Sequence, residues 1–352
     1  MRNVLFDARW LRPGMTGVGY FALRLLESLP GSKEGMGIIL PAGSPYIRDF
    51  AGFRIFETKV DLTNHPLTEF YEQFAIPFLC YRYGYRSFVS FEARVPLFHP
   101  GIRTCCFVYD LSFLKIKGSH NLRYSAFLYT TLKLHSRFAS RLFTISKTVQ
   151  GQIAESLGLS ESKIKVIYPA DSGLARREPM PAPSLQRPYF LAVGATNPRK
   201  NLSVLLRGFS LFRQKHPGYL LAVTGDKAWI ESRVAETGAK GVINLGFVKE
   251  GELRWLYENA QALVFPSLDE GFGIPLVDAA GFDCPILCSD IPVFREVAED
   301  GAVYFDPISS ESMAARMEEA GPQSDRKRGN AIAQRFVWEK SAAGFLDEVR
   351  NG

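Results

Sequence analysis

Two carboxylates on either side of a glycine-rich turn are the residues of this sequence best suited to chemistry. Glu270 and Asp278 stand eight positions apart. The turn between them contains the residues Gly271, Phe272, Gly273 and Ile274. An apolar run precedes the turn, and Pro275 suits the start of a helix because the first helical position needs no backbone N–H. Since a helix start presents free N–H groups to negative charge, we expect both acids to face one ligand that is partly anionic.

A pair of cations, Arg199 and Lys200, follows another strand-like segment. Gly194 begins the run that leads to them, and a helical pattern follows from Leu202. Arginine offers a planar fork of donors and lysine offers a compact charge, and both suit a diphosphate at a helix start. The alternative is a solvated basic helix start without a ligand. We expect Gly194, Arg199 and Lys200 to bind a diphosphate.

Gly17 and Gly19 lie in the loop that we expect after the first strand. Together with Ala22 they fit the weak glycine pattern of dinucleotide-binding proteins. That pattern follows its strand directly, whereas residues 8–15 intervene here, and no acid ends a second strand about 20 residues further on. The sequence therefore argues against dinucleotide binding and favours a loop that faces the ligand.

Polar and aromatic residues follow two further strand-like segments. Tyr109 and Asp110 come directly after residues 105–108, and a phenol can donate a hydrogen bond to an oxygen atom of a ligand. Phe247 and Val248 come after the strand-like residues 242–245 and Gly246. We expect both pairs of residues at the ligand site.

Strand-like segments alternate with helical patterns along the chain, which predicts an α/β fold built from right-handed parallel βαβ units. Residues 171–188 are rich in proline and lack a period, so we expect them to link two domains. The domains would span residues 1–170 and 189–335, with a last segment at 336–352. Each would be a Rossmann-like, doubly wound sheet, and ligands would bind in a cleft at the carboxyl ends of the strands.

In combination, these motifs resemble the retaining family-4 glycosyltransferases of GT-B fold (glycosyl transferases group 1), and among them bacterial mannosyltransferases. Six segments carry the resemblance, at residues 16–19, 109–114, 143–147, 194–201, 270–278 and 289–296. The resemblance implies two Rossmann-like domains with an interdomain cleft. It also implies a C-terminal helix, within 336–352, that returns to the N-terminal, acceptor-side domain.

The resemblance further implies roles for the charged residues. Arg199 and Lys200 would bind the donor pyrophosphate, and Glu270 would contact hydroxyls of the transferred sugar. Asp278 would hold the ribose hydroxyls. This chain departs from the family here, because the family has a second glutamate where Asp278 stands.

The pair Tyr109 and Asp110 departs from the family as well, since the family usually has histidine followed by aspartate near the transferred sugar. We count both residues among the catalytic ones. A phenol is a poorer proton shuttle than an imidazole near neutral pH. We therefore expect that the histidine is not needed for the chemistry, and the alternative is an altered enzyme. The glycines at 17 and 19 would face the pyrophosphate or the acceptor, and the nucleobase would stack near Phe247 and Val248.

The charge of the chain is unevenly distributed. Residues 1–170 contain 21 Lys and Arg against 12 Asp and Glu, within a net charge of +6 for the whole chain. A basic half suggests an anionic partner such as a membrane surface, and scattered solvated charge is the alternative. Residues 81–86 interleave tyrosine with arginine, as interfacial segments do. No nucleic-acid-binding motif is present. We expect a cytoplasmic protein, without a spanning segment, at the inner face of the cytoplasmic membrane.

Neither a metal nor a resident cofactor is expected. The sequence contains no Asp-x-Asp pair, which metal-dependent transferases of the other major fold use to hold a divalent cation. Its five cysteines and five histidines show no ligand spacing. A nucleotide diphosphate sugar, GDP-mannose as the first choice, would enter as a co-substrate.

We therefore expect a metal-independent retaining glycosyltransferase of lipopolysaccharide or other polysaccharide biosynthesis. It would move a hexose, mannose as the first choice, from a nucleotide diphosphate sugar to a hydroxyl of a glycan or lipid-linked glycan. Two alternatives remain open, a non-hydrolysing nucleotide-sugar epimerase and a non-catalytic glycan-binding protein on a degenerate transferase fold. The scarcity of histidine in the motifs argues against the first, and the departures at Tyr109 and Asp278 are the support for the second.

Overall fold

The computed structural model describes residues 3–15, 17–60, 65–115, 122–181, 185, 188–320 and 329–351. These residues form two compact units. The N-unit contains the described residues up to Pro169 and the last segment from Trp338, and the C-unit runs from Ala170 to Val337. Residues 171–181, within the expected linker, belong to the C-unit.

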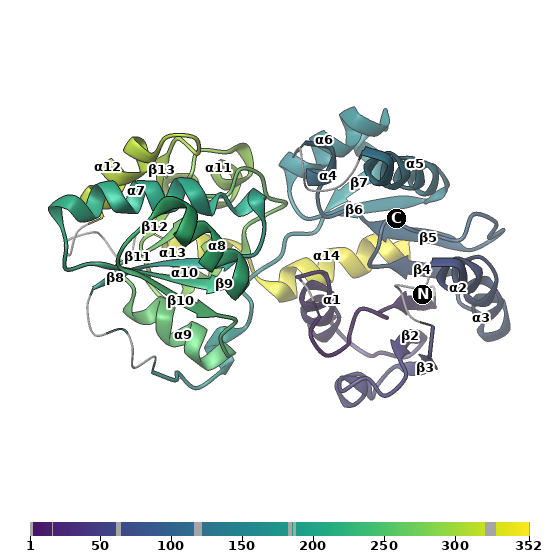
Figure 1. Ribbon diagram of the computed structural model, residues 1–352. Helices are drawn as coiled ribbons and strands as arrows, with labels where there is room; N and C mark the ends of the chain where they lie inside the picture. Colours follow the sequence, from purple (N-terminus) through teal and green to yellow (C-terminus); the bar gives the residue numbers. More distant parts are fainter. Residues whose placement is uncertain are drawn as a thin grey trace. The chain divides into compact units, whose positions relative to one another are not determined.

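The N-unit is built on a seven-stranded parallel sheet in the order β3-β2-β1-β4-β5-β6-β7 (Figure 1). Its strands are β1 (Val4–Asp7), β2 (Met36–Pro41), β3 (Arg54–Thr58), β4 (Ser87–Ser90), β5 (Arg103–Phe107), β6 (Arg141–Thr144) and β7 (Ile164–Val166). Its helices are α1 (Gly17–Glu27), α2 (His65–Phe70), α3 (Ile76–Tyr83), α4 (Ser112–Lys115), α5 (Leu122–Phe138), α6 (Lys147–Leu157) and α14 (Trp338–Asn351), and a π-helical turn, Tyr71–Ala75, joins α2 to α3. Because β1 pairs with both β2 and β4, the strand order reverses at β1.

The C-unit is built on a six-stranded parallel sheet in the order β10-β9-β8-β11-β12-β13. Its strands are β8 (Tyr189–Ala195), β9 (Leu220–Gly225), β10 (Val242–Gly246), β11 (Ala262–Phe265), β12 (Ile286–Ser289) and β13 (Val303–Phe305). Its helices are α7 (Leu202–Lys215), α8 (Lys227–Thr237), α9 (Glu250–Asn259), α10 (Ile274–Gly281), α11 (Pro292–Ala298), α12 (Ser310–Glu319) and α13 (Asn330–Arg335). Here β8 pairs with β9 and β11, so the order reverses at β8.

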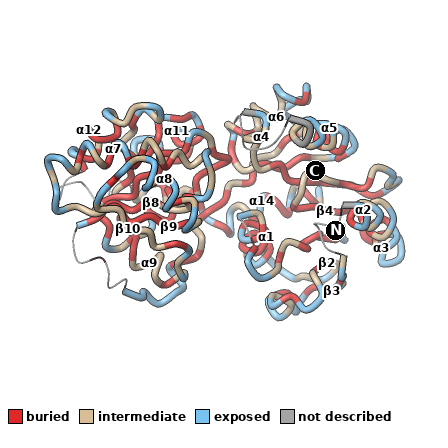
Figure 2. Tube along the Cα trace, viewed as in Figure 1, coloured by how far each residue is buried: buried red, intermediate tan, exposed pale blue. Residues whose placement is uncertain are grey.

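Both sheets have the doubly wound α/β architecture that the alternation of segments predicted. Every residue of β1 and of β11 is buried. Most residues of β8 and β9 are buried as well (Figure 2). A run of consecutive buried residues is typical of a parallel strand covered by helices on both faces. No helix among the described residues is both long enough and apolar enough to cross a membrane.

The last helix, α14, completes the core of the N-unit, although the whole C-unit precedes it in the sequence (Figure 1). Its Phe345 is fully buried, and the centre of that ring lies between 5.1 and 6.4 Å from the ring centres of Phe6, Phe91, Phe107 and Phe143. Burying one such side chain contributes about 1.5–3 kcal/mol. The aromatic cluster therefore ties the end of the chain to the first sheet.

Candidate functional site

The predicted charged residues of the C-unit follow the two strands at which the strand order reverses. Arg199 and Lys200 lie in a short 3-10 turn after β8, and Glu270 lies in the loop after β11. At such a reversal the two connections leave the sheet on opposite faces, so that a crevice opens at the ends of the strands. The fold thereby brings Lys200 and Glu270 into contact across 70 positions of sequence.

Glu270 is held by both cations. Its Oε1 accepts hydrogen bonds from Nζ of Lys200 at 2.7 Å and from Oγ of Ser267 at 2.8 Å. Its Oε2 accepts a hydrogen bond from Nη1 of Arg199, and the same nitrogen donates to the carbonyl oxygen of Asp269 at 2.7 Å. Three of the predicted catalytic residues therefore form one ion-paired cluster.

The charge state of Glu270 follows from these contacts. Burial by itself would raise the pKa of Glu270, because only 7% of the residue is exposed. The charges of Lys200 and Arg199, with hydrogen bonds from Lys200 and Ser267, outweigh burial and hold the pKa below its ordinary value of 4.5. Two cations thus surround one ionised carboxylate at neutral pH, and the excess positive charge suits an anionic ligand.

Asn201 fixes the cationic turn to the acidic turn. Its Nδ2 donates hydrogen bonds to the carbonyl oxygens of Pro266 at 3.1 Å and Pro307 at 2.7 Å. The backbone N–H of Leu268 donates to the carbonyl oxygen of Arg199 at 2.9 Å. Asn201 itself has a left-handed φ of 53°, which asparagine adopts more readily than most residues. The two loops are thus joined by neutral hydrogen bonds as well as by charge.

The glycine-rich turn owes its shape to packing. Gly273 has a φ of 107°, and a Cβ at that position would lie 3.0 Å from the ring of Phe294. The Phe272 side chain is buried in the core, edge-on to Phe336 with ring centres 5.0 Å apart. Gly271 is buried, and Ile274, which begins α10, is half-buried. Contact of these turn residues with a donor stays a prediction, and for Phe272 it would be made by the backbone.

Asp278 lies on α10, and its carboxylate is engaged within the C-unit. Its Oδ1 accepts hydrogen bonds from the backbone N of Ser172 at 2.7 Å and from Oγ of Ser172 at 3.0 Å. Burial, which these bonds offset only in part, raises the pKa of Asp278 to about 7. Asp278 also borders a small cavity of about 90 Å³. The expected contact with ribose stays a prediction, and a nucleotide would compete with Ser172 for this carboxylate.

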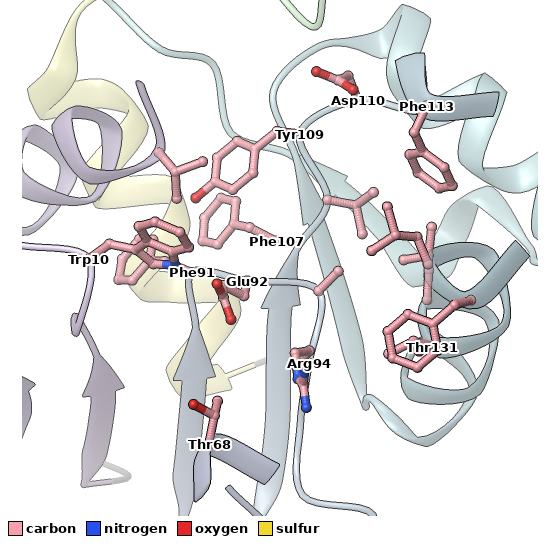
Figure 3. A pocket seen from close by; sticks show the side chains of 16 residues that line it. Trp10, Thr68, Phe91, Glu92, Arg94, Phe107, Tyr109, Asp110, Phe113 and Thr131 are labelled. Atoms are coloured by element: carbon pink, nitrogen blue, oxygen red, sulfur yellow. The ribbon is translucent and has the colours of Figure 1, made fainter. Parts of the chain in front are cut away.

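Tyr109 and Asp110 border a cavity of about 560 Å³ in the N-unit (Figure 3). The Tyr109 ring is stacked on Phe107 at 5.7 Å, and its buried hydroxyl has no hydrogen-bond partner among the described residues. Burial, and then the charge of Glu92, raise the pKa of Tyr109 well above 10, so the hydroxyl is a donor at neutral pH. Asp110 instead accepts hydrogen bonds from N and Oγ of Ser112, at 2.9 and 2.7 Å, and so shapes the turn that leads into α4.

The remaining predicted residues lie at the ends of other elements. Gly17 and Gly19 belong to the first turns of α1 and not to a loop as expected, because packing of the apolar face of α1 outweighs the low helix propensity of glycine. A Cβ at Gly19 would lie 2.7 Å from the Cβ of Met15, so the chain needs glycine there. Gly194 has a φ of 74° at the end of β8, beside the Lys200 side chain. Threonine 16, in the same expected loop, lies outside the described residues.

Phe247 and Val248 follow β10 in the C-unit. The Phe247 residue is 80% exposed, so one of its faces is open to a planar group. Val248 is half-buried beside it. Stacking of a nucleobase at Phe247 stays a prediction.

Sequence reasoning did not assign roles to Ser267, Asn201, Trp10 or Glu92. Ser267 follows β11, Trp10 follows β1, and Glu92 follows β4. A signal for these three was present, because residues just past the carboxyl end of a buried parallel strand are where such sheets bind ligands. Asn201 had no such signal, because its role depends on hydrogen bonds to carbonyl groups that are distant in sequence.

Comparison with known proteins identifies the C-unit. Residues 178–334 match the family "Glycosyl transferases group 1". The chain carries a glycosyl transferases group 1 domain. Its relatives include the O-antigen chain mannosyltransferase RfbU of Salmonella typhimurium, which is 31% identical over 210 residues that cover 58% of each chain. The O-antigen chain mannosyltransferase B of Escherichia coli is 25% identical over 99% of both chains.

Solved structures of glycosyltransferases share the fold. Anabaena HepE in complex with UDP and glucose matches with a TM-score of 0.75 and 16% identity over 100% of both chains. WaaG, a glycosyltransferase involved in lipopolysaccharide biosynthesis, matches with a TM-score of 0.74 and 14% identity over 99% of this chain and 100% of that one. The prediction of a glycosyltransferase with the GT-B fold is confirmed, and nothing in the comparisons supports an epimerase or a non-catalytic protein.

Proposed function

We propose that this glycosyltransferase moves a mannosyl residue from a nucleotide diphosphate mannose to a hydroxyl of a glycan or lipid-linked glycan, with retention of the anomeric configuration. The observation that carries the proposal is the contact of Glu270 with both Arg199 and Lys200 at the strand-order reversal of the C-unit. The names of the O-antigen mannosyltransferases among its relatives support mannose as the sugar. We expect GDP-mannose as the donor.

Arg199 and Lys200 would bind the donor diphosphate. Both side chains already contact a carboxylate, and a diphosphate offers similar oxygen acceptors with more negative charge. As the bond between sugar and phosphate breaks, negative charge develops on the departing diphosphate. Cations that are fixed in advance stabilise this charge more in the transition state than in the ground state. We expect that this arrangement suffices without a divalent cation.

Glu270 would exchange part of its contact with the cations for hydrogen bonds from hydroxyls of the transferred sugar. Ser267 would keep Oε1 oriented during that exchange, because its hydroxyl does not compete for the diphosphate. The leaving phosphate and the incoming acceptor hydroxyl would lie on the same side of the sugar. The phosphate oxygen would accept the proton of the acceptor hydroxyl, so the reaction would require no protein nucleophile.

The donor test compares GDP-mannose with UDP-, ADP- and dTDP-hexoses. We expect GDP-mannose to give the fastest release of nucleotide diphosphate, and GDP to give the largest rise in melting temperature among the four free diphosphates. NMR of the product should show an axial anomeric linkage, as in the donor. Preference for another base would reject GDP-mannose, and an inverted product would reject the mechanism. If no donor released its nucleotide, the proposed transfer would be abandoned.

We also propose that the enzyme meets its acceptor at an anionic membrane surface through one side of the helical segment 65–83. This side, the aromatic stripe, consists of Leu67, Phe70, Phe74, Phe78 and Tyr81, each between 53 and 64% exposed. A spacing of three or four positions places them on one face of a continuous helical segment. The opposite face is buried against the N-unit at Thr68, Glu72, Ile76 and Cys80. A large apolar face without a cover indicates an interaction surface.

Positive charge continues the aromatic stripe at its C-terminal end, where Arg82 and Arg86 are exposed. The guanidinium groups of Arg54 and Arg82 lie 5.0 and 5.4 Å from the ring centre of Tyr83. Both acids of the segment pair with Arg94 and not with these cations. Aromatic rings beside exposed basic groups favour an anionic lipid interface. Within residues 81–86, the tyrosine at 85 is buried and does not contribute.

Co-sedimentation with vesicles tests this surface. The wild type should bind vesicles that contain phosphatidylglycerol at low salt and lose binding at high salt. Replacing Phe74 and Phe78 with serine should weaken binding more than about 100-fold, since two buried phenylalanines together contribute about 3–6 kcal/mol. Ile308→Ser, at a position 78% exposed in the C-unit, is the matched control. Wild-type binding by the double variant would exclude the stripe, and no binding at low salt would favour a soluble acceptor.

A further inference from the structure

The cavity of the N-unit lies where the strand order of its sheet reverses, between β1 and β4. Trp10 follows β1, Glu92 follows β4 and Tyr109 follows β5, and all three side chains line the cavity (Figure 3). Its volume of about 560 Å³ lies within the range of about 300–1,000 Å³ found for small-molecule sites. The position at the reversal is where open α/β sheets bind ligands.

Two buried hydrogen-bond donors in this cavity are unused. Nε1 of Trp10 and the hydroxyl of Tyr109 have no partner among the described residues. Figure 3 shows both groups turned toward the part of the cavity where Glu92 lies. Leaving buried donors unpaired costs free energy, and a ligand that supplies oxygen acceptors would remove that cost.

The walls of the cavity are apolar and partly open. Phe113 of α4 and Phe127 of α5 line one side, and the Phe127 residue is 53% exposed. Aromatic faces suit the C–H faces of a sugar ring, whose hydroxyls point outward from its rim. An apolar wall with a few polar groups on one side therefore matches a pyranose better than a uniformly polar ligand.

Glu92 sets the charge of the cavity. Its carboxylate forms no hydrogen bond or ion pair with a described residue, and burial, Glu72 and Asp7 raise the pKa of Glu92 to about 7. The two nearby arginines form ion pairs with other acids. Arg9 pairs with Asp7 and Glu72, and Arg94 pairs with Glu69 and Glu72. A hydroxyl could donate to Glu92, whereas an anionic ligand would be repelled.

We propose that this cavity binds one uncharged hexopyranose ring of the acceptor. Trp10 and Tyr109 donate hydrogen bonds to oxygens of that ring, and Glu92 accepts one from a hydroxyl and excludes sugars that carry an acidic group. The inference rests on the proposed transfer to a glycan, and it adds the residues that select the acceptor sugar.

Saturation-transfer NMR on the full chain, without donor, tests the cavity with methyl α-D-mannopyranoside as the probe. Affinity should rise about tenfold from pH 6 to pH 8, because a carboxyl with a pKa near 7 goes from mostly protonated to mostly ionised, and the ionised form is the stronger acceptor. Glu92→Gln should abolish this pH dependence, and Glu155→Gln, at an exposed position of α6, should retain it. The other charged and titratable groups of this region remain unchanged in both variants: Asp7, Arg9, Glu69, Glu72, Arg94, Tyr109 and Asp110.

Variants of the two donors provide a second readout. Trp10→Phe and Tyr109→Phe keep the rings and should each weaken probe binding about three- to tenfold while the pH dependence persists. Methyl β-D-glucuronide, a pyranoside with a carboxylate, should bind at least about tenfold more weakly than the mannoside at pH 8, the scale of a like-charge penalty. Melting curves establish that each variant is folded.

The outcomes separate this inference from the proposed function. Absence of mannoside binding, equal or tighter binding of the glucuronide, or an unchanged pH profile in Glu92→Gln would overturn the cavity assignment. None of these measurements requires transfer. A protein that binds the probe as described but transfers no sugar would refute the proposed function alone, and one that transfers sugar without binding the probe would refute the cavity alone.

Discussion

Replacing Lys200 with methionine removes one of the two cations that hold Glu270 and leaves the bulk of the side chain. Arg199 and Ser267 still contact the carboxylate in the variant. If Lys200 stabilises the departing diphosphate, the rate of transfer should fall about 10²- to 10³-fold, which corresponds to about 2.7–4 kcal/mol of lost transition-state stabilisation. Arg199→Met should show a somewhat smaller loss, because Arg199 is also tied to the Asp269 carbonyl.

The same substitution should change stability in a pH-dependent way. Lys200 donates one charged hydrogen bond to a buried acid, and such a bond contributes about 1.5–3 kcal/mol. In a unit of the size of the C-unit, a loss of that size should lower the melting temperature by about 3–12 °C at pH 7. Because the pKa of Glu270 is depressed in the folded state, its stabilising contribution is present above about pH 4.5 and is lost as pH falls through the folded pKa. The difference in melting temperature should therefore narrow below pH 4.5.

Release of nucleotide diphosphate from an accepted donor, measured beside thermal melts at pH 4 and pH 7, provides both readouts. Lys215→Met is the matched control, because Lys215 forms a 2.8 Å ion pair with Glu318 at the surface, and its side chain is 70% exposed. That variant should keep its rate and its melting temperature, because water screens an exposed ion pair. If Lys200→Met worked within threefold of the wild-type rate, the assignment of the diphosphate to this cation would be wrong.

Four further predictions concern other parts of the structure. Tyr109→Phe should slow transfer about three- to tenfold through loss of one hydrogen bond, and Tyr109→His should remain active; a folded but inactive histidine variant would show that this site has diverged from the family. Asp278→Asn should melt at a higher temperature than the wild type at pH 8 and at the same temperature at pH 4. The folded state raises the pKa of Asp278 from its ordinary value of 3.8 to about 7, so ionisation of this group destabilises the wild type as pH rises above 3.8. An equal difference in melting temperature at both pH values would contradict a buried ionising group. Asp278→Ala should weaken binding of the free nucleotide diphosphate by about 1–3 kcal/mol in calorimetry. Unchanged affinity would show that Asp278 does not bind the ribose. Transfer should persist in excess EDTA, and strict dependence on magnesium or manganese would contradict the roles given to the cations.

The sequence by itself determined the fold class and most of the charged cluster. Alternating apolar strands and amphipathic helices specify a parallel α/β architecture, because each strand must be apolar on both faces when helices cover both. Arg199, Lys200 and Glu270 were found because each stands directly after a strand or at a turn, and that position is a local property of the chain. The same rule would have indicated Trp10 and Glu92, which follow β1 and β4.

Only the tertiary structure decided which of these residues meet. Glu270 contacts Lys200, 70 positions earlier, and Arg199, 71 positions earlier, because β8 and β11 are neighbours in the sheet. No single segment of the sequence specifies the order of the strands. Asp278 accepts hydrogen bonds from Ser172, 106 positions away, because the rotation of α10 about its axis sets the direction of each side chain. The burial of Phe272 and the place of α14 in the N-unit likewise depend on packing between segments that are distant in sequence. Periodicity specifies each element and its apolar face, whereas the pairing of elements follows from the free energy of burying all those faces together.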